Sequence, residues 1–526
     1  MDQILHIFRK DVRQHWYAIL VSLAILAGFA WNETKNWAPQ RQDVDFFFRQ
    51  AFLPLLTPLV VIAWMFLIVR VVQGESLVGD RQFWVTRPYE WKKLLVAKFL
   101  FFVVFINVPL FIAQAALLRK AGYAPSAYVH GLLWMQLLWV VILILPTTTL
   151  ATITSSLGQV VLVVLGILVF VIGYVSLSSR FNSPNVVLTV SWTDEWLVIL
   201  AIPSSVCLAV VLWQYARRRA LQSRLLLIGY VVAILAFPNI PVKQTDVDRA
   251  YPQPVAGQPS PVQLAFDPVT KTTQEFPLKT KNKVWVWIPL LASGIAPNSE
   301  VQIRAITAKI VTPDGVNWDS HWLGAGEVLL PGHSHAQVRF PMDRAVFNRV
   351  QSSFATVHIS FGLSIFKASA TNQVSASASD FTAIGETSCW MAPELSGMLE
   401  CRSPMRNPFL LLTAQADETT CHLGENEKAA LSGKIVSTAT WNTDAAPAEF
   451  GISPVKTFSL FLSDRVTPND PSNVLCPGTP LTFSTLVWGS RTRAELTIDG
   501  IHVGDYQFKD SRSPGIVTGG VGVSVP

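Results

Sequence analysis

The 526 residues carry a formal net charge of +6, but only 14% of them are charged and 50% are apolar. Soluble globular proteins carry about 25% charged residues, so these values exclude an ordinary soluble protein, and the small positive charge gives no reason to expect nucleic acid as a partner. Residues 1–238 hold the long apolar runs, whereas residues 239–526 are polar and rich in Pro, Ser and Thr. This division predicts an α-helical membrane domain followed by a soluble region.

A short basic segment, residues 1–14, opens the chain. Helical spacing puts Leu5, Phe8 and Val12 on one face and leaves the cations Arg9, Lys10 and Arg13 on the rest. The pattern predicts an amphipathic helix suited to an anionic membrane surface, although the charges could equally serve only to set the topology.

Seven apolar stretches follow within residues 15–238. They cover residues 15–31, 54–72, 95–118, 132–153, 159–177, 196–213 and 224–238. A helix needs about 20 mainly apolar residues to cross a bilayer, so six of the stretches predict spans. The seventh is short and can span only if Arg224 reaches the interface, which makes the prediction six to seven transmembrane helices.

The cations predict the orientation of these spans. With the N-terminus in the cytoplasm, thirteen Lys and Arg residues fall on the cytoplasmic side and six on the other side. Cytoplasmic loops of membrane proteins carry the excess of Lys and Arg. We therefore expect a multi-pass protein of the cell membrane with its N-terminus inside and, after seven spans, residues 239–526 outside the cytoplasm.

The loop between the second and third spans alternates charged with aromatic residues, which suits docking onto a partner protein. Its most notable side chains are Glu75, Asp80, Arg81, Phe83, Trp84, Arg87 and Pro88. Pro88 predicts the end of a short helix near Arg87.

The order of motifs in residues 1–220 resembles the permease subunits of ABC-2 type transporters. The matching residues are Phe8 to Asp11 with Arg13; Glu75, Leu77, Gly79 to Arg81, Phe83, Trp84 and Thr86 to Pro88; and Leu94, Leu95, Ala97 and Lys98. The resemblance implies a six-span transport domain that works as a homo- or heterodimer with separate ATP-binding subunits. It also implies that Glu75 to Pro88 hold or adjoin the coupling helix that contacts the ATPase.

Polar residues inside the predicted spans are few, and the clearest are Asn107, Gln114 and Gln136. Intramembrane ionisable residues usually mark ion pathways, and their scarcity at mid-span argues against a proton-coupled transporter or an ion channel. For Asn107 we favour a hydrogen bond between helices over a place on a transport path.

The second half changes from helical to strand periodicity. Residues 239–281 are rich in proline and predict an extended linker, with one or two strands toward its end. Residues 282–510 contain short alternating stretches such as 284–288, 336–340, 357–365, 457–462 and 494–498, which predict an all-β, sandwich-like region of one or two modules. Residues 511–526 form a low-complexity tail.

Four cysteines, Cys389, Cys401, Cys421 and Cys476, lie in this β-rich region. An even number in an exported domain predicts two disulfides with three possible connectivities. Proximity favours Cys389 with Cys401 and Cys421 with Cys476. A four-thiolate zinc site is the alternative, but the spacings lack the short pair that such sites favour.

The sequence holds no phosphate loop, no H-E-x-x-H and no G-x-S-x-G motif. His333 and His335 form the only close external histidine pair, and without a third ligand nearby it predicts no metal site. We therefore expect neither an enzyme nor a cofactor, with energy supplied by a partner ATPase. Two alternatives to a transport subunit stay open: a non-transporting membrane anchor that presents a β-sandwich binding module, and an anchored hydrolase that no motif supports.

Overall fold

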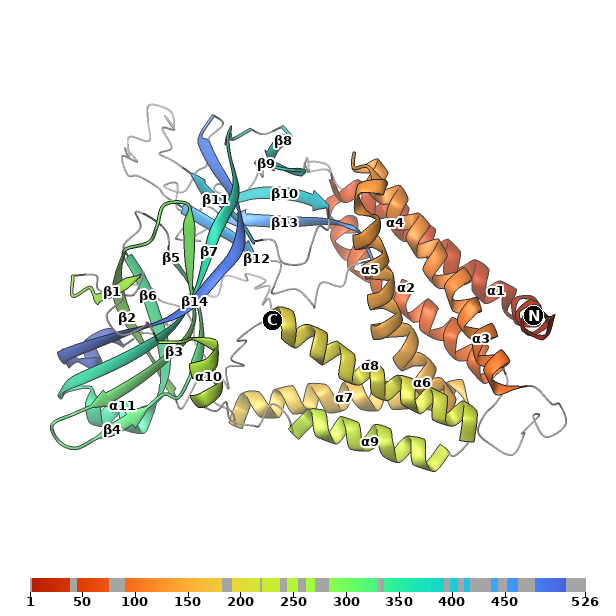
Figure 1. Ribbon diagram of the computed structural model, residues 1–526, viewed down its shortest axis with the longest axis horizontal. Coiled ribbons are helices and arrows are strands. Elements are labelled where there is room, and N and C mark those ends of the chain that lie inside the picture. The colour runs from red at the N-terminus through yellow and green to blue at the C-terminus, as the bar shows by residue number, and fades with distance from the viewer. Residues whose placement is uncertain are drawn as a thin grey trace. The chain divides into compact units, whose positions relative to one another are not determined.

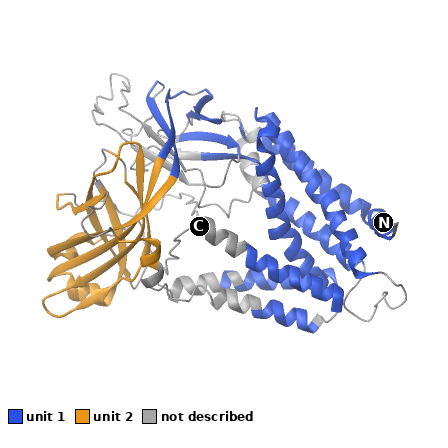
Figure 2. Ribbon diagram, in the orientation of Figure 1, with its two compact units in different colours: residues 1–177, 191–240, 368–487 blue, residues 178–190, 241–367, 488–526 orange. Residues whose placement is uncertain are grey.

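The computed structural model places helices in the first half of the chain and mainly strands in the second (Figure 1). It describes residues 2–37, 45–74, 90–181, 192–217, 220–236, 244–253, 262–269, 283–329, 331, 335–377, 379–391, 398–404, 411–416, 437–442, 452–461 and 478–507. The chain forms two compact units. Unit 1 comprises residues 1–177, 191–240 and 368–487, and unit 2 comprises residues 178–190, 241–367 and 488–526 (Figure 2).

Helix α1, Asp2–Glu33, is kinked at His15, whose backbone angles (φ −114°, ψ 16°) are not helical. The kink divides the basic segment from the first span at the boundary that the sequence predicts. The face of the basic segment differs from our expectation. Ile7 and Asp11 are its buried residues, whereas Leu5 is 46% exposed. Ile7 joins a cluster with Leu94 of α3, Trp91–Phe102, and Val211 of α8, Trp192–Arg217, so this segment packs against other helices along that face.

The third and fourth spans are each interrupted by a wide helical turn. Helix α3, Trp91–Phe102, continues through a π-helical turn, Val103–Asn107, into α4, Val108–Lys120. After the short 3-10 turn Pro125–Tyr128, helix α5, Val129–Trp139, likewise continues through a π-helical turn, Val140–Ile144, into α6, Leu145–Ile153. Each wide turn stands just before a proline, Pro109 or Pro146. Proline lacks the N–H that the regular helical bond needs, which favours such a rearrangement.

The remaining helices are α2, Asp45–Gln73; α7, Leu157–Phe181; α8, Trp192–Arg217; and α9, Ala220–Ala236. Helices therefore cover all seven predicted stretches, but four spans among the described residues are long and apolar enough to cross a membrane, rather than six or seven. They are Gln3–Glu33, Leu55–Gln73, Trp91–Lys120 and Pro125–Ile153, and Leu157–Phe170 forms a shorter apolar helix.

Arg224, the first residue of the seventh predicted stretch, contacts the end of α6. Its guanidinium donates two hydrogen bonds, of 2.8 and 3.1 Å, to the carbonyl of Ile153, the last residue of α6. A cation at a helix C-terminus satisfies carbonyls that have no partner in the helix and opposes the negative end of its dipole.

Unit 1 also contains a β region within residues 368–487. Strands β8, Phe381–Ile384; β9, Thr387–Met391; β10, Met398–Pro404; and β13, Val455–Phe461, form a sheet in the order β13-β10-β9-β8. Strand β11, Leu411–Ala416, pairs with β12, Ser437–Asn442, and with the first part of β14, Pro480–His502. The disulfide Cys389–Cys401 joins opposite residues of β9 and β10, which confirms that predicted pairing; Cys421 and Cys476 lie outside the described residues.

Unit 2 contains strands at the predicted alternating stretches 284–288, 336–340 and 357–365, and further strands that the sequence did not predict. Strand β3, Ser299–Val311, pairs with β7, Phe354–Ser375, and with the short strands β4, Asn317–Asp319, and β5, Leu323–Leu329. A second sheet has the order β1-β2-β6, with β1 at Gln263–Phe266, β2 at Lys283–Ser293 and β6 at His335–Asp343. Helix α11, Arg344–Val350, follows β6 and contributes Phe347 and Val350 to the buried core. The unit boundary falls within β7 and within β14.

The predicted linker, residues 239–281, contains more structure than an extended chain. Helix α10, Gln244–Ala250, lies within it, and β1 pairs with β2. Tyr251 follows α10 and is 1% exposed. A Cβ atom on Gly362 would lie 2.9 Å from the ring of Tyr251, so glycine leaves the space that the ring occupies. Asp248 also forms a 2.6 Å ion pair with Arg493. These contacts hold Asp248 and Tyr251, two of the described residues of the segment, against other parts of unit 2.

Candidate functional site

A buried ion pair joins the ends of three helices beside the loop between the second and third spans. The Nζ of Lys98 lies 2.8 Å from Oδ2 of Asp11, and the two side chains are 2% and 3% exposed. The same Nζ donates a 2.9 Å hydrogen bond to the carbonyl of Val71. Asp11 belongs to α1, Val71 to α2 and Lys98 to α3, so a single ammonium group connects all three.

Local sequence explains why both charges point inward. Lys98 follows Leu94 by four positions on the buried face of α3, and Asp11 follows Ile7 by four positions on the buried face of α1. Removing two charges from water costs several kcal/mol per ion, and mutual attraction with further hydrogen bonds has to offset that cost. A shift that separated the two side chains would therefore leave each charge buried without its partner.

The ion pair stands at the base of the loop that the sequence singled out. Helix α2 ends at Gln73 and α3 begins at Trp91. The predicted coupling residues Glu75, Asp80, Arg81, Phe83, Trp84, Arg87 and Pro88 lie outside the described residues. Asp11 lies in the matching motif before the first span and Lys98 in the one that follows this loop, and no sequence pattern pairs the two.

A chain of amide hydrogen bonds runs through the interior of the helix bundle. Nδ2 of Asn107 donates to Oε1 of Gln136 at 3.2 Å, and Nε2 of Gln136 donates to Oε1 of Gln114 at 2.8 Å. Nε2 of Gln114 then donates to the carbonyl of Ile452 at 3.0 Å. All three amide side chains are buried. The three polar residues that the sequence identified in the spans thus bond between helices, and they lead to the β region.

The segment that holds Ile452 is part of the bundle core. Ile452 is 1% exposed and Val455 is 2% exposed, and both belong to the hydrophobic cluster that includes Leu117 and Tyr128. Nothing in the periodicity of the sequence marks these two residues, because Ile452 stands 338 positions after its hydrogen-bond partner Gln114.

Further contacts hold the β region of unit 1 against the same end of the bundle. The hydroxyl of Tyr123, in the turn after α4, donates a 3.0 Å hydrogen bond to the carbonyl of Glu386. Burial raises the pKa of this hydroxyl above its ordinary value of 10.0, so it stays protonated and can donate. The guanidinium of Arg402 donates to the carbonyl of Trp37, just after α1, at 3.4 Å. In Figure 1, β10 and β13 extend toward the helices at this end.

One continuous helical run carries both features. Lys98 and Gln114 lie within Trp91–Lys120 and are separated by sixteen residues (114 − 98). At 1.5 Å per residue this is about 24 Å along the axis. Asn107 lies between them, in the π-helical turn, and its Oδ1 is buried without a partner among the described atoms. The run therefore links the base of the loop to the carbonyl of Ile452.

The described residues contain no group of three or more His, Cys, Asp or Glu side chains arranged to hold a metal ion. His333 lies outside them, and His335 is described only as the first residue of β6. Searches for similar proteins found no match of the chain to a protein-family model or to a curated protein.

Proposed function

We propose that this protein is a permease-like subunit of an ABC-2 type transport system that works in export with a separate ATPase subunit. In this proposal six or seven helices cross the cell membrane, the N-terminus is cytoplasmic and the β regions lie outside the cytoplasm. The membrane domain pairs with a second one, of the same or a related chain. The motifs around residues 8–13 and 75–98 and one structural observation support this assignment.

That observation is the buried contact of Lys98 with Asp11 and Val71. Both flanks of the 75–89 loop, together with the basic segment before the first span, meet at one ammonium group. A force applied to the loop by an ATPase would reach α1, α2 and α3 together, since none of the three can shift alone without breaking a buried charge contact. This arrangement suits a membrane domain driven from its cytoplasmic side.

The hydrogen bonds between the amide side chains would carry movement of the helices on to the β region. Movement of α3 and α4 acts on Gln114, which bonds to the carbonyl of Ile452, and so reaches the β region of unit 1. The β region would then change position as the ATPase pair closes, and handle substrate or partner outside the cytoplasm. Because the chain has no phosphate loop, ATP binding belongs to the partner.

The test is affinity purification of the full chain from native membranes in mild detergent, with mass spectrometry and an ATPase assay. We expect a stoichiometric nucleotide-binding partner that is lost with Arg81→Glu or Trp84→Ala. Arg349→Glu is the matched control, because it reverses an exposed charge on α11, in the other unit, and should leave the complex intact. A clean preparation with no ATPase would overturn the proposal.

A non-transporting membrane anchor for a β-sandwich binding module is the second candidate. The chain of amide hydrogen bonds favours the anchor. The amide side chains donate to one another and to the carbonyl of Ile452, and these donors are therefore not directed at a solvated transport path. An anchor predicts that Arg81→Glu leaves the cellular function unchanged, whereas a transport subunit predicts that the same substitution abolishes it.

A further inference from the structure

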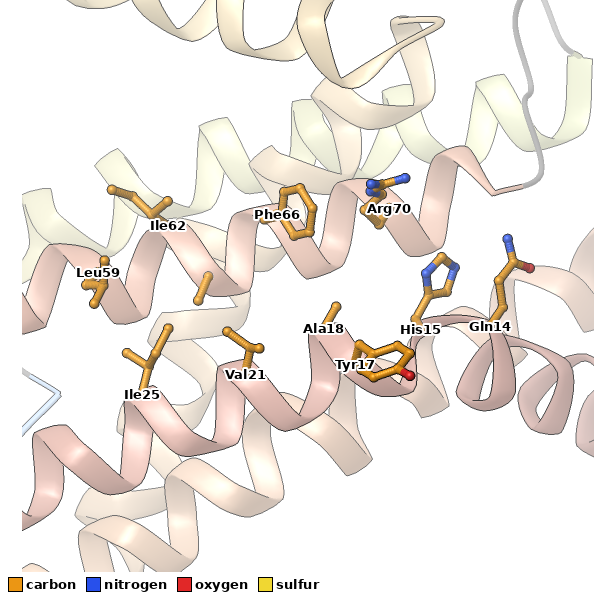
Figure 3. A pocket seen from close by; sticks show the side chains of 11 residues that line it. Gln14, His15, Tyr17, Ala18, Val21, Ile25, Leu59, Ile62, Phe66 and Arg70 are labelled. Atoms are coloured by element: carbon orange, nitrogen blue, oxygen red, sulfur yellow. The ribbon is translucent and has the colours of Figure 1, made fainter.

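An open groove runs between α1 and α2 on the surface of the helix bundle. Its volume is about 600 Å³, and successive turns of the two helices line it. Figure 3 shows their side chains facing each other across it, with Gln14, His15 and Arg70 at one end and Ile25 and Leu59 at the other. Ligand sites in proteins commonly have volumes of about 300–1,000 Å³, so the groove is large enough for part of an amphiphile.

Most of the groove is apolar and open. Val21 is 57% exposed, Ile62 is 60% exposed and Leu59 is 45% exposed. All three lie in segments that are long and apolar enough to cross a membrane. In such segments an exposed apolar wall meets lipid hydrocarbon rather than water.

The end of the groove that lies beside the kink in α1 is polar and cationic. The guanidinium of Arg70 lies 5.2 Å from the centre of the Phe66 ring, which holds the charge beside the apolar wall. His15, at the kink, is 9% exposed, and its Nε2 is buried without a partner among the described atoms. Lys10 and Arg13 stand on the preceding turns of α1.

We propose that this groove binds an anionic phospholipid of the surrounding bilayer. One acyl chain lies along Val21, Leu59 and Ile62, and the phosphate lies at Arg70, whose planar guanidinium suits a phosphate group. A headgroup oxygen beside His15 gives its ring nitrogen a partner. Lys10 and Arg13 favour an anionic over a zwitterionic headgroup, as basic clusters next to membrane helices do. This inference is independent of the proposed transport activity.

Native mass spectrometry of the full chain tests the proposal. The protein is reconstituted in vesicles of equal parts phosphatidylglycerol and phosphatidylcholine, extracted in mild detergent and analysed for retained lipid. We expect phosphatidylglycerol to be enriched, and Arg70→Gln to reduce its retention by about 10-fold, as expected for a lost charge-assisted contact. Arg70→Lys should keep part of the enrichment.

Arg217→Gln is the matched control. Its guanidinium also lies 5.2 Å from an aromatic ring, that of Trp213, but outside the groove, so retention should not change. Ala63→Phe fills the groove and keeps every cation, and should abolish retention while gel filtration confirms a folded protein. Retention at the bulk lipid ratio, or a photo-crosslinker at position 62 that attaches to a second copy of the chain instead of lipid, would overturn the proposal.

Discussion

The side-chain amide of Gln114 donates a 3.0 Å hydrogen bond to the backbone carbonyl of Ile452, although 338 positions separate the two residues. Inside an apolar bundle, water is not at hand to replace a lost partner, so the bond ties the position of the 452–455 segment to α4. The β region of unit 1 is therefore part of the packed membrane bundle rather than a separate module on a tether.

Gln114→Leu should loosen this attachment. The substitution removes the donor to Ile452 and the acceptor of Gln136, and we expect a loss of about 1–2 kcal/mol, in the range of such bonds between membrane helices. Hydrogen exchange of residues 452–461 measures it as faster exchange. Gln222→Leu is the control, because this exposed glutamine accepts a hydrogen bond from the indole of Trp213 and lies away from the 452–461 segment in sequence. Unchanged exchange in Gln114→Leu would show that packing alone holds the segment.

Lys98→Met should lower the free energy of unfolding strongly, although the two side chains are similar in size. It leaves the carboxylate of Asp11 buried without its cation, and losing one partner of a buried pair costs about 3–5 kcal/mol. Lys93→Met on the same helix is a close control. Its pair with Glu90 has the same length of 2.8 Å but exposures of 38% and 64%, and such pairs contribute about 0–1 kcal/mol. Equilibrium unfolding in detergent compares the two variants.

A double variant distinguishes a charge effect from a packing effect at this position. Asp11→Leu combined with Lys98→Met removes both charges, and we expect it to recover most of the stability that Lys98→Met loses. If the double variant still fails to carry out the cellular function, the pair is needed for movement between states rather than for folding. If it is as unstable as Lys98→Met alone, the buried pair is not the cause of the loss.

The Cys389–Cys401 disulfide gives a test of the compartment. In intact cells the two thiols should resist maleimide until a reductant is added, because disulfides persist in oxidising compartments. Labelling of both before reduction would contradict an extracytoplasmic β region.

Cys389→Ser should also lower stability by about 3 kcal/mol, since the bridge closes a loop over a sequence separation of 12 residues.

Glu327 in β5 should make unit 2 more stable in mild acid than at neutral pH. Burial raises the pKa of this carboxyl above its ordinary value of 4.5, and the Arg339 guanidinium offsets part of the rise. The folded state then binds more protons than the unfolded state, so the contribution favours folding below about pH 4.5 and is lost as the pH rises through the higher folded pKa.

Glu327→Gln removes this ionisation. We expect the variant to unfold at a higher temperature than the natural protein at pH 7, and the difference to shrink as the pH falls to 4.5. The exposed Glu495 of β14 provides the control variant Glu495→Gln, which should follow the natural protein across the series. A constant difference at every pH would point to altered packing instead of ionisation.

Several features could be read from the sequence because they depend on local pattern. Apolar runs predicted the helices, alternation predicted strands such as β6 and β7, and the proximity of Cys389 and Cys401 predicted their disulfide. The polar residues Asn107, Gln114 and Gln136 stood out because amides are rare in apolar spans. In each case the signal is local in the sequence, in the periodicity and composition of one element or in a short separation between two residues.

Only the tertiary structure decided which of these residues meet. Asp11 and Lys98 read as two charges in separate motifs, and Ile452 reads as an apolar residue in a polar half of the chain. Their roles depend on contacts between elements that are 87 and 338 positions apart. Likewise, Tyr251 in the predicted linker lies against Gly362 of β7. Sequence period fixes which face of an element is apolar, whereas the burial of a charge or a carbonyl depends on what packs against that face.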